Sequence, residues 1–128
     1  MHVTNRRPTE SLPVIALLVE EGLAHAREQL AMLAGASAKY SAKFETVEDA
    51  ALDRFGRFFA DELGVQMIYE GYVVRWSREP ANAHEQRELA RLRQVLAHTR
   101  ATLAEGEWML GTLKEHIARR KTAAPRSF

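Results

Sequence analysis

Apolar residues between positions 12 and 33 recur with the spacing of one helical face. Four of them lie seven residues apart: Leu12, Val19, Ala26 and Leu33. A second set lies between them, at Ala16, Leu23 and Leu30. Positions three, four and seven apart share a face, so the pattern predicts an amphipathic helix. We expect it to begin near Ser11, with Pro13 in its first turn, and to end or weaken at Gly35.

A second helix is predicted to begin at Thr46, which forms a capping-box-like pair with Asp49. Residues 35–45 before it are expected to be a short helical connection packed by Tyr40 and Phe44. The apolar residues from 52 to 76 cover more than half of the helix circumference, so we expect this helix to be the most buried. Glycine weakens a helix by about 1 kcal/mol relative to alanine. A break at Gly64 would divide the second helix in two.

The third predicted helix carries the most regular pattern in the chain. It begins after the capping pair Asn82 and Glu85 and runs to about Arg120. Its core positions are spaced alternately three and four residues apart: Leu89, Leu92, Leu96, Thr99, Leu103, Gly106, Leu110, Leu113 and Ile117. This spacing is typical of a coiled-coil seam, and it continues over four heptads.

A second row on the third helix consists of small residues seven apart: Ala90, Ala97, Ala104, Gly111 and Ala118. Such a row favours the close approach of another helix, although alanine is also simply a good helix former. Arg93 and Arg100 lie between the two rows, where their aliphatic stems can cover apolar surface.

Trp108 lies opposite the leucine seam, at a position normally occupied by a polar residue. Tryptophan is a favoured anchor in binding interfaces. The structural alternative is that it covers the end of the bundle or a dimer contact. The candidate interface consists of Trp108, Arg93, Arg100, Ala97, Ala104 and Gly111 on the third helix, with Tyr72 and Trp76 on the second.

These patterns predict an all-α protein, an antiparallel bundle of three long helices with a coiled-coil-like third helix. We expect a flexible arm over residues 1–10, one helical domain over 11–119 and a flexible basic tail over 120–128. The 128 residues are enough for one domain with its own core. Helices this long usually bury their remaining apolar surface against a partner, and a symmetric homodimer is the commonest arrangement.

The charge of the chain is concentrated at its ends. The net charge is +1, but residues 11–118 carry more acidic than basic side chains. A nucleic-acid contact would have to use the ends, through Arg6, Arg7, Arg119, Arg120 and Lys121. No apolar run approaches the roughly 18 residues that cross a bilayer, so we expect a cytoplasmic protein that does not bind membranes.

The sequence contains no recognisable catalytic or cofactor-binding motif. It has no cysteine, which excludes disulfides and thiol catalysis. None of the five histidines follows a glutamate by three residues, the spacing typical of di-iron carboxylate bundles. There is also no glycine-rich phosphate loop and no nucleophile elbow. We expect neither an enzyme nor a cofactor.

The function that these observations favour is a small helical interaction protein: a regulator, adaptor or antagonist that acts through protein contacts as a homodimer. One alternative is a nucleic-acid-associated regulatory factor that uses the basic ends. Another is a helical-bundle enzyme that binds a ligand or a metal between its helices.

Overall fold

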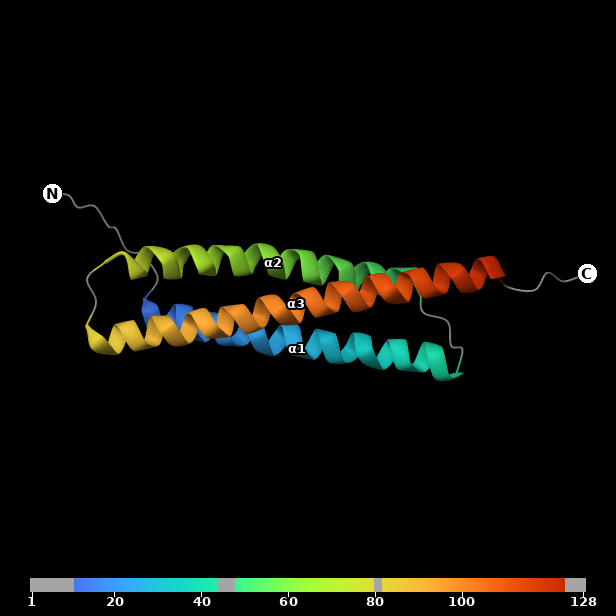
Figure 1. Ribbon diagram of the computed structural model, residues 1–128, viewed down its shortest axis with the longest axis horizontal. Coiled ribbons are helices and arrows are strands. Elements are labelled where there is room, and N and C mark those ends of the chain that lie inside the picture. The colour runs from blue at the N-terminus through green and yellow to red at the C-terminus, as the bar shows by residue number, and fades with distance from the viewer. Residues whose placement is uncertain (1–10, 44–47, 80–81, 124–128) are drawn as a thin grey trace, which may run out of the picture.

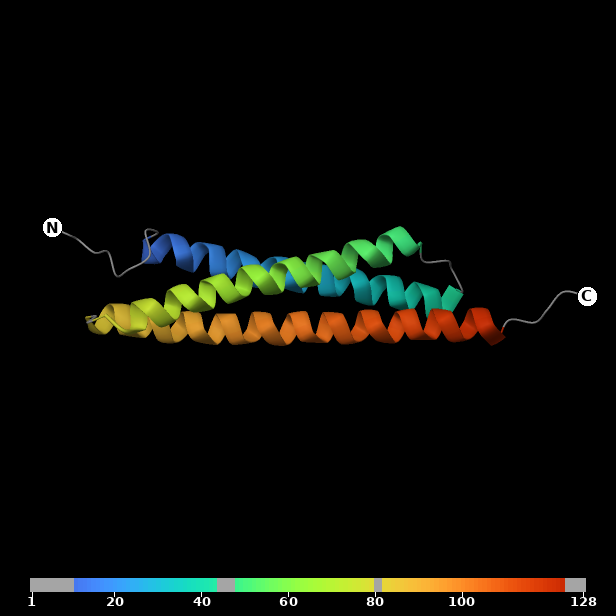
Figure 2. The same cartoon turned by 90° about the horizontal axis from the view of Figure 1, so that it is seen from above.

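The computed structural model describes residues 11–43, 48–79 and 82–123. Helix α1 spans Leu12–Lys43, α2 spans Asp49–Ser77 and α3 spans Ala83–Ala123. The chain reverses direction at each connection, and each helix contacts the other two (Figure 1). The view from above shows α2 crossing α1, with α3 running alongside both (Figure 2). The prediction of an all-α antiparallel bundle of three long helices is confirmed.

Side-chain caps mark the beginnings of two helices. The backbone N–H of Glu85 donates to Asn82 Oδ1 at 2.8 Å, which confirms the capping pair predicted for the third helix. The N–H of Val14 donates to Ser11 Oγ at 3.4 Å, at the predicted start of the first. Helix α2 begins at Asp49, and its N-cap residue Glu48 makes no side-chain cap bond. The predicted cap Thr46 lies outside the described residues.

Two predictions that relied on glycine are wrong. Helix α1 does not end at Gly35 but continues to Lys43, and Tyr40 is buried in that extension. Phe44, the predicted partner of Tyr40, lies outside the described residues. Helix α2 is continuous through Gly64. A glycine costs about 1 kcal/mol in a helix, which is less than the packing of a long apolar face provides.

The seam predicted on α3 forms the centre of the bundle. All nine of its positions, from Leu89 to Ile117, are buried, and α3 runs past Arg120 to Ala123. The core consists of two apolar clusters. One surrounds Ile15, Val73 and Leu92, and the other surrounds Leu33, Phe59 and Leu103. Together they occupy the length of the bundle.

A polar layer lies between the two clusters. Gln66 on α2 is 4% exposed and Thr99 on α3 is 1% exposed. Thr99 Oγ1 donates to the carbonyl of Val95 at 3.0 Å, one turn earlier in the same helix. Buried polar groups are costly unless they are hydrogen-bonded, and both of these side chains have a partner.

Helix α2 is not the most buried helix, contrary to the prediction. Five of its described residues are buried: Leu52, Phe59, Gln66, Val73 and Trp76. Several large apolar side chains on α2 are instead exposed: Val65, Met67, Ile68 and Val74. Each helix of a three-helix bundle faces only two neighbours, so an apolar surface wider than that contact stays outside. Within the described residues, no helix is both long enough and apolar enough to cross a membrane.

Candidate functional site

The outer face of α3 carries most of the interface candidates. Ala97, Ala104 and Gly111 are all exposed, and a Cβ added at Gly111 would meet no atom within 4 Å. Neither α1 nor α2 therefore packs on this part of the small-residue row. If the row has a packing role, its partner must come from another chain.

Trp108 projects from the same outer face and is 69% exposed. Its side chain borders a shallow groove of about 380 Å³ between α3 and α1. The α1 side of the groove consists of small residues, Ala34, Ser37 and Ala38, and the α3 side includes Met109 and His116. The exposed indole does not close the end of the bundle, because it lies in the interior of α3.

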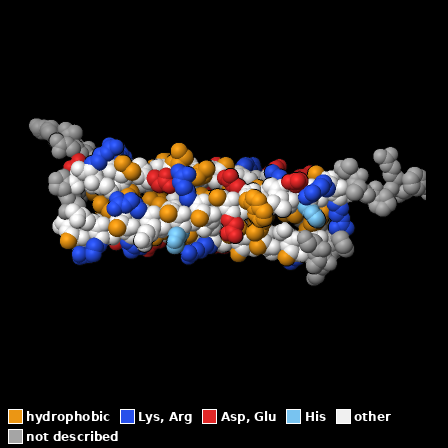
Figure 3. All heavy atoms as spheres, in the orientation of Figure 1, with side chains coloured by type: hydrophobic (Ala, Val, Ile, Leu, Met, Phe, Trp, Pro, Cys, Tyr) orange, Lys and Arg blue, Asp and Glu red, His pale blue; other side chains and the backbone are white. Residues whose placement is uncertain are grey.

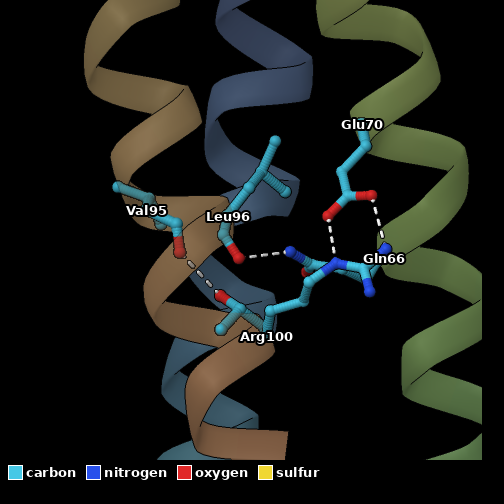
Figure 4. A network of polar contacts seen from close by, with 6 residues as sticks. Gln66, Glu70, Val95, Leu96 and Arg100 are labelled. Atoms are coloured by element: carbon cyan, nitrogen blue, oxygen red, sulfur yellow. Dashed lines mark hydrogen bonds and ion pairs between the residues drawn. The ribbon is translucent and has the colours of Figure 1, made fainter.

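Arg93 and Arg100 both reach across to α2. The Nη1 of Arg93 donates to Ser77 Oγ at 2.8 Å. The guanidinium of Arg100 donates through two nitrogens to the Glu70 carboxylate, each bond 2.8 Å long (Figure 4). Both arginines thus hold α2 against α3, and their charged groups are already used within the chain.

The two aromatic candidates on α2 lie in or against the core. Trp76 is 3% exposed and belongs to the first apolar cluster. Its buried indole N–H has no hydrogen-bond partner among the described residues. Tyr72 is partly buried against that cluster, and the guanidinium carbon of Arg75 lies 5.1 Å from its ring centroid. Of the two, Tyr72 offers surface to a partner, while Trp76 offers almost none.

Sequence reasoning missed a groove between α1 and α2. One hollow, of about 110 Å³, is bordered by Leu18 and His25 on α1 and by Glu62, Val65 and Tyr69 on α2. A second hollow, of about 660 Å³, lies further along the same two helices. Its lining includes Met32 on α1 and Phe55, Phe58 and Arg54 on α2. Apolar side chains therefore line both parts of the groove.

Glu62 is the most unusual titratable group in this groove. Its Oε2 atom is buried and has no hydrogen-bond partner within the described part of the chain. Burial raises the pKa of Glu62, the nearby His25 lowers it in part, and the neighbouring carboxylate of Asp61 raises it further.

A cross-helix hydrogen bond lies directly beside the same hollow. The side-chain amide of Gln66 donates to the carbonyl of Leu96 at 2.5 Å, joining α2 to α3 (Figure 4). The hydrogen bonds from Arg100 lower the pKa of the neighbouring Glu70 carboxyl group, partial burial opposes this effect, and the Gln66 side chain lowers the pKa to a smaller extent. Gln66, Glu70 and Arg100 therefore form one polar network at the middle of the bundle.

The described residues contain no cluster of metal ligands, and they include only some of the basic residues considered for a nucleic-acid contact. Within residues 11–43, 48–79 and 82–123, no three His, Asp or Glu side chains are grouped so that they could hold a metal ion. The basic residues Arg119, Arg120 and Lys121 lie in the last turns of α3, where Arg120 packs over the Tyr40 ring. Arg6 and Arg7 lie outside the described residues. Figure 3 shows charges of both signs intermixed on one face of the bundle.

Comparison with protein families, with curated proteins and with solved structures gave no match to this chain. Its function is therefore inferred from the surfaces described above.

Proposed function

We propose that this protein is a small helical interaction protein, a regulator, adaptor or antagonist that acts through protein–protein contacts and forms a homodimer. One observation carries the proposal. The described part of the chain exposes eight large hydrophobic side chains: Val14, Leu17, Met32, Val65, Met67, Ile68, Val74 and Trp108. Val14 and Leu17 on α1, and Val65 and Ile68 on α2, each lie one helical turn apart, and neighbouring exposed apolar side chains are typical of surfaces that bind a partner.

The outer face of α3 supports the homodimer. It combines an exposed tryptophan with small residues at Ala97, Ala104 and Gly111, so a second helix can approach closely around the indole. Tryptophan is enriched among the residues that dominate binding energy. In a twofold interface the same face serves both subunits.

The proposal is tested by capture of partners from cells of the source organism on the immobilised full-length chain. We expect one protein to be retained at near-stoichiometric yield and to be lost when Met32→Lys or Trp108→Ala is used as bait. Circular dichroism would first establish that both variants keep their helical content. Retention of the same proteins by wild type and by both variants would contradict the proposal.

A further inference from the structure

The larger hollow between α1 and α2 has an apolar base. Phe55 and Phe58 lie one turn apart on α2, are half-buried and pack against the second core cluster. Each ring also contacts the buried ring of Phe59, with centroids 6.5 Å and 5.7 Å apart. Met32 lines the same hollow from α1 and is 54% exposed. The core therefore holds the two phenyl rings in place, while part of their surface stays open to solvent.

Two arginines form the rim of this hollow on α2. Arg54 and Arg57 are exposed and lie one turn apart, beside the phenylalanine pair. Among the described residues, neither guanidinium takes part in a hydrogen bond or a salt bridge. In this they differ from Arg93 and Arg100, whose charged groups are used within the chain. The rim of the larger hollow therefore carries two unpaired cations next to apolar surface.

One carboxylate also borders the hollow, but it lies towards the opposite end. Asp61 follows Arg57 by one turn and Arg54 by two turns. Because α1 and α2 are antiparallel, Asp61 lies towards Gln29 on α1, while Arg54 lies towards Ala36 (Figure 1). The two positive charges are thus together at the end nearest the beginning of α2, where they favour a negatively charged group.

The size and chemistry of the hollow limit what can occupy it. Its volume of about 660 Å³ is within the range of sites that bind small molecules, which combine apolar walls with a few polar groups. The neighbouring hollow holds only about 110 Å³ and is bordered by Glu21 and Glu62. An anionic ligand is therefore expected to occupy the larger hollow alone.

We propose that the larger α1/α2 hollow binds a small anionic amphiphile, a single-chain carboxylate of the fatty-acid class. Its carboxylate accepts hydrogen bonds from Arg54 and Arg57, because the planar guanidinium group matches the geometry of a carboxylate. Its chain covers Met32, Phe55 and Phe58. The inference goes beyond the proposed function, because it adds a ligand on a face that the homodimer contact on α3 does not use.

Isothermal titration calorimetry of the full-length chain tests this inference, with each ligand kept below the concentration at which it forms micelles. We expect one decanoate to bind per chain, at least about tenfold more tightly than decyltrimethylammonium, which has the same chain and the opposite charge. Hexanoate should bind at least about tenfold more weakly than decanoate, because it buries fewer methylene groups. Added salt should weaken the binding of decanoate.

Matched arginine variants separate the rim from the rest of the surface. We expect Arg54→Gln and Arg57→Gln each to weaken decanoate binding by about threefold, and the double variant by about tenfold. Arg87→Gln is the control, because Arg87 is exposed on α3 and does not border the hollow; it should change the affinity by less than about 1.5-fold. Met32→Gln should weaken binding of the chain by about threefold. Circular dichroism and urea unfolding would establish that all variants fold as wild type does.

Equal affinity for decanoate and decyltrimethylammonium would overturn the inference. Equal losses in Arg57→Gln and Arg87→Gln would overturn it as well, because the preference would then reflect the net charge of the chain. Binding to phosphatidylglycerol vesicles without binding of decanoate would assign the two arginines to a membrane surface instead. None of these results decides whether a protein partner is captured, so the proposed function stands or fails separately.

Discussion

The ring of Phe59 on α2 lies directly against the backbone of Gly106 on α3. Phe59 is fully buried, and a Cβ added at Gly106 would collide with two atoms of its ring, Cε1 and Cζ. Gly106 occupies a position of the α3 seam that is otherwise filled by leucine, isoleucine and threonine. Glycine at this position lets α2 and α3 approach closely enough to bury the whole aromatic ring.

Gly106→Ala is therefore expected to destabilise the protein. Overpacking a core costs about 1–3 kcal/mol, and the better helix propensity of alanine returns up to about 1 kcal/mol. We expect a net loss of about 1–2 kcal/mol in the free energy of unfolding in urea. Gly111→Ala is the control, because it lies in the same helix with nothing nearby. Gly111→Ala should increase the free energy of unfolding by about 0.5–1 kcal/mol. Equal effects of Gly106→Ala and Gly111→Ala would contradict the close contact between Gly106 and Phe59.

Replacing Gln66 tests the polar layer at the middle of the core. Gln66→Met keeps the shape of the side chain and removes its hydrogen bond to Leu96, so we expect a change of less than about 1 kcal/mol. Gln66→Ala leaves a cavity and should cost about 2–4 kcal/mol. Both changes in the free energy of unfolding would be measured by urea denaturation. A loss in Gln66→Met as large as that in Gln66→Ala would show that the hydrogen bond, not the volume, stabilises this layer.

The partly buried carboxyl group of Glu62 predicts a pH dependence of stability. Burial raises its pKa in the folded protein, so the folded chain holds this proton to a higher pH than the unfolded chain does. The corresponding stability is complete below the ordinary pKa of glutamate and is lost as the pH rises through the folded-state value. Glu62→Gln should therefore gain stability relative to wild type between pH 4 and pH 7. A difference in stability between Glu62→Gln and wild type that does not change with pH would contradict the burial of this carboxyl group.

Glu70 predicts the opposite dependence of stability on pH. Its two hydrogen bonds to Arg100 lower its pKa in the folded protein. The stability that it contributes is present above the ordinary pKa and is lost as the pH falls through the lowered one. Glu70→Gln should therefore be less stable than wild type at pH 7, with the difference shrinking towards pH 2 and in high salt. Unfolding curves of both glutamine variants over one pH series compare the two carboxyl groups directly.

The third helix could be predicted from the sequence almost completely, because its pattern is set by a two-sided contact along its length. Every position of its seam, from Leu89 to Ile117, is buried. The first helix could be predicted in the same way, and Leu12, Val19, Ala26 and Leu33 are all in the core. Predictions failed where a local signal opposed packing. Gly35 and Gly64 disfavour a helix only weakly, and the apolar faces on either side continue through them.

The α1/α2 groove could not be predicted, because it depends on which turn of α1 faces which turn of α2. One signal was nevertheless present in the sequence. Phe55, Glu62, Tyr69 and Trp76 lie seven residues apart, so one acidic residue interrupts an aromatic row on α2. Gln66 likewise interrupts the row of Leu52, Phe59 and Val73. A polar residue in an apolar heptad row indicates either a buried hydrogen bond or a polar group without a hydrogen-bond partner.

Self-association is the contact that can be tested without identifying a partner. Multi-angle light scattering of the wild-type chain over the micromolar range should give twice the mass of the 14.5 kDa monomer. Trp108→Lys and Ala104→Leu change the outer face of α3 and should shift the mass towards that of the monomer, while Met67→Lys should leave it unchanged. A constant 14.5 kDa for wild type across this range would contradict the homodimer.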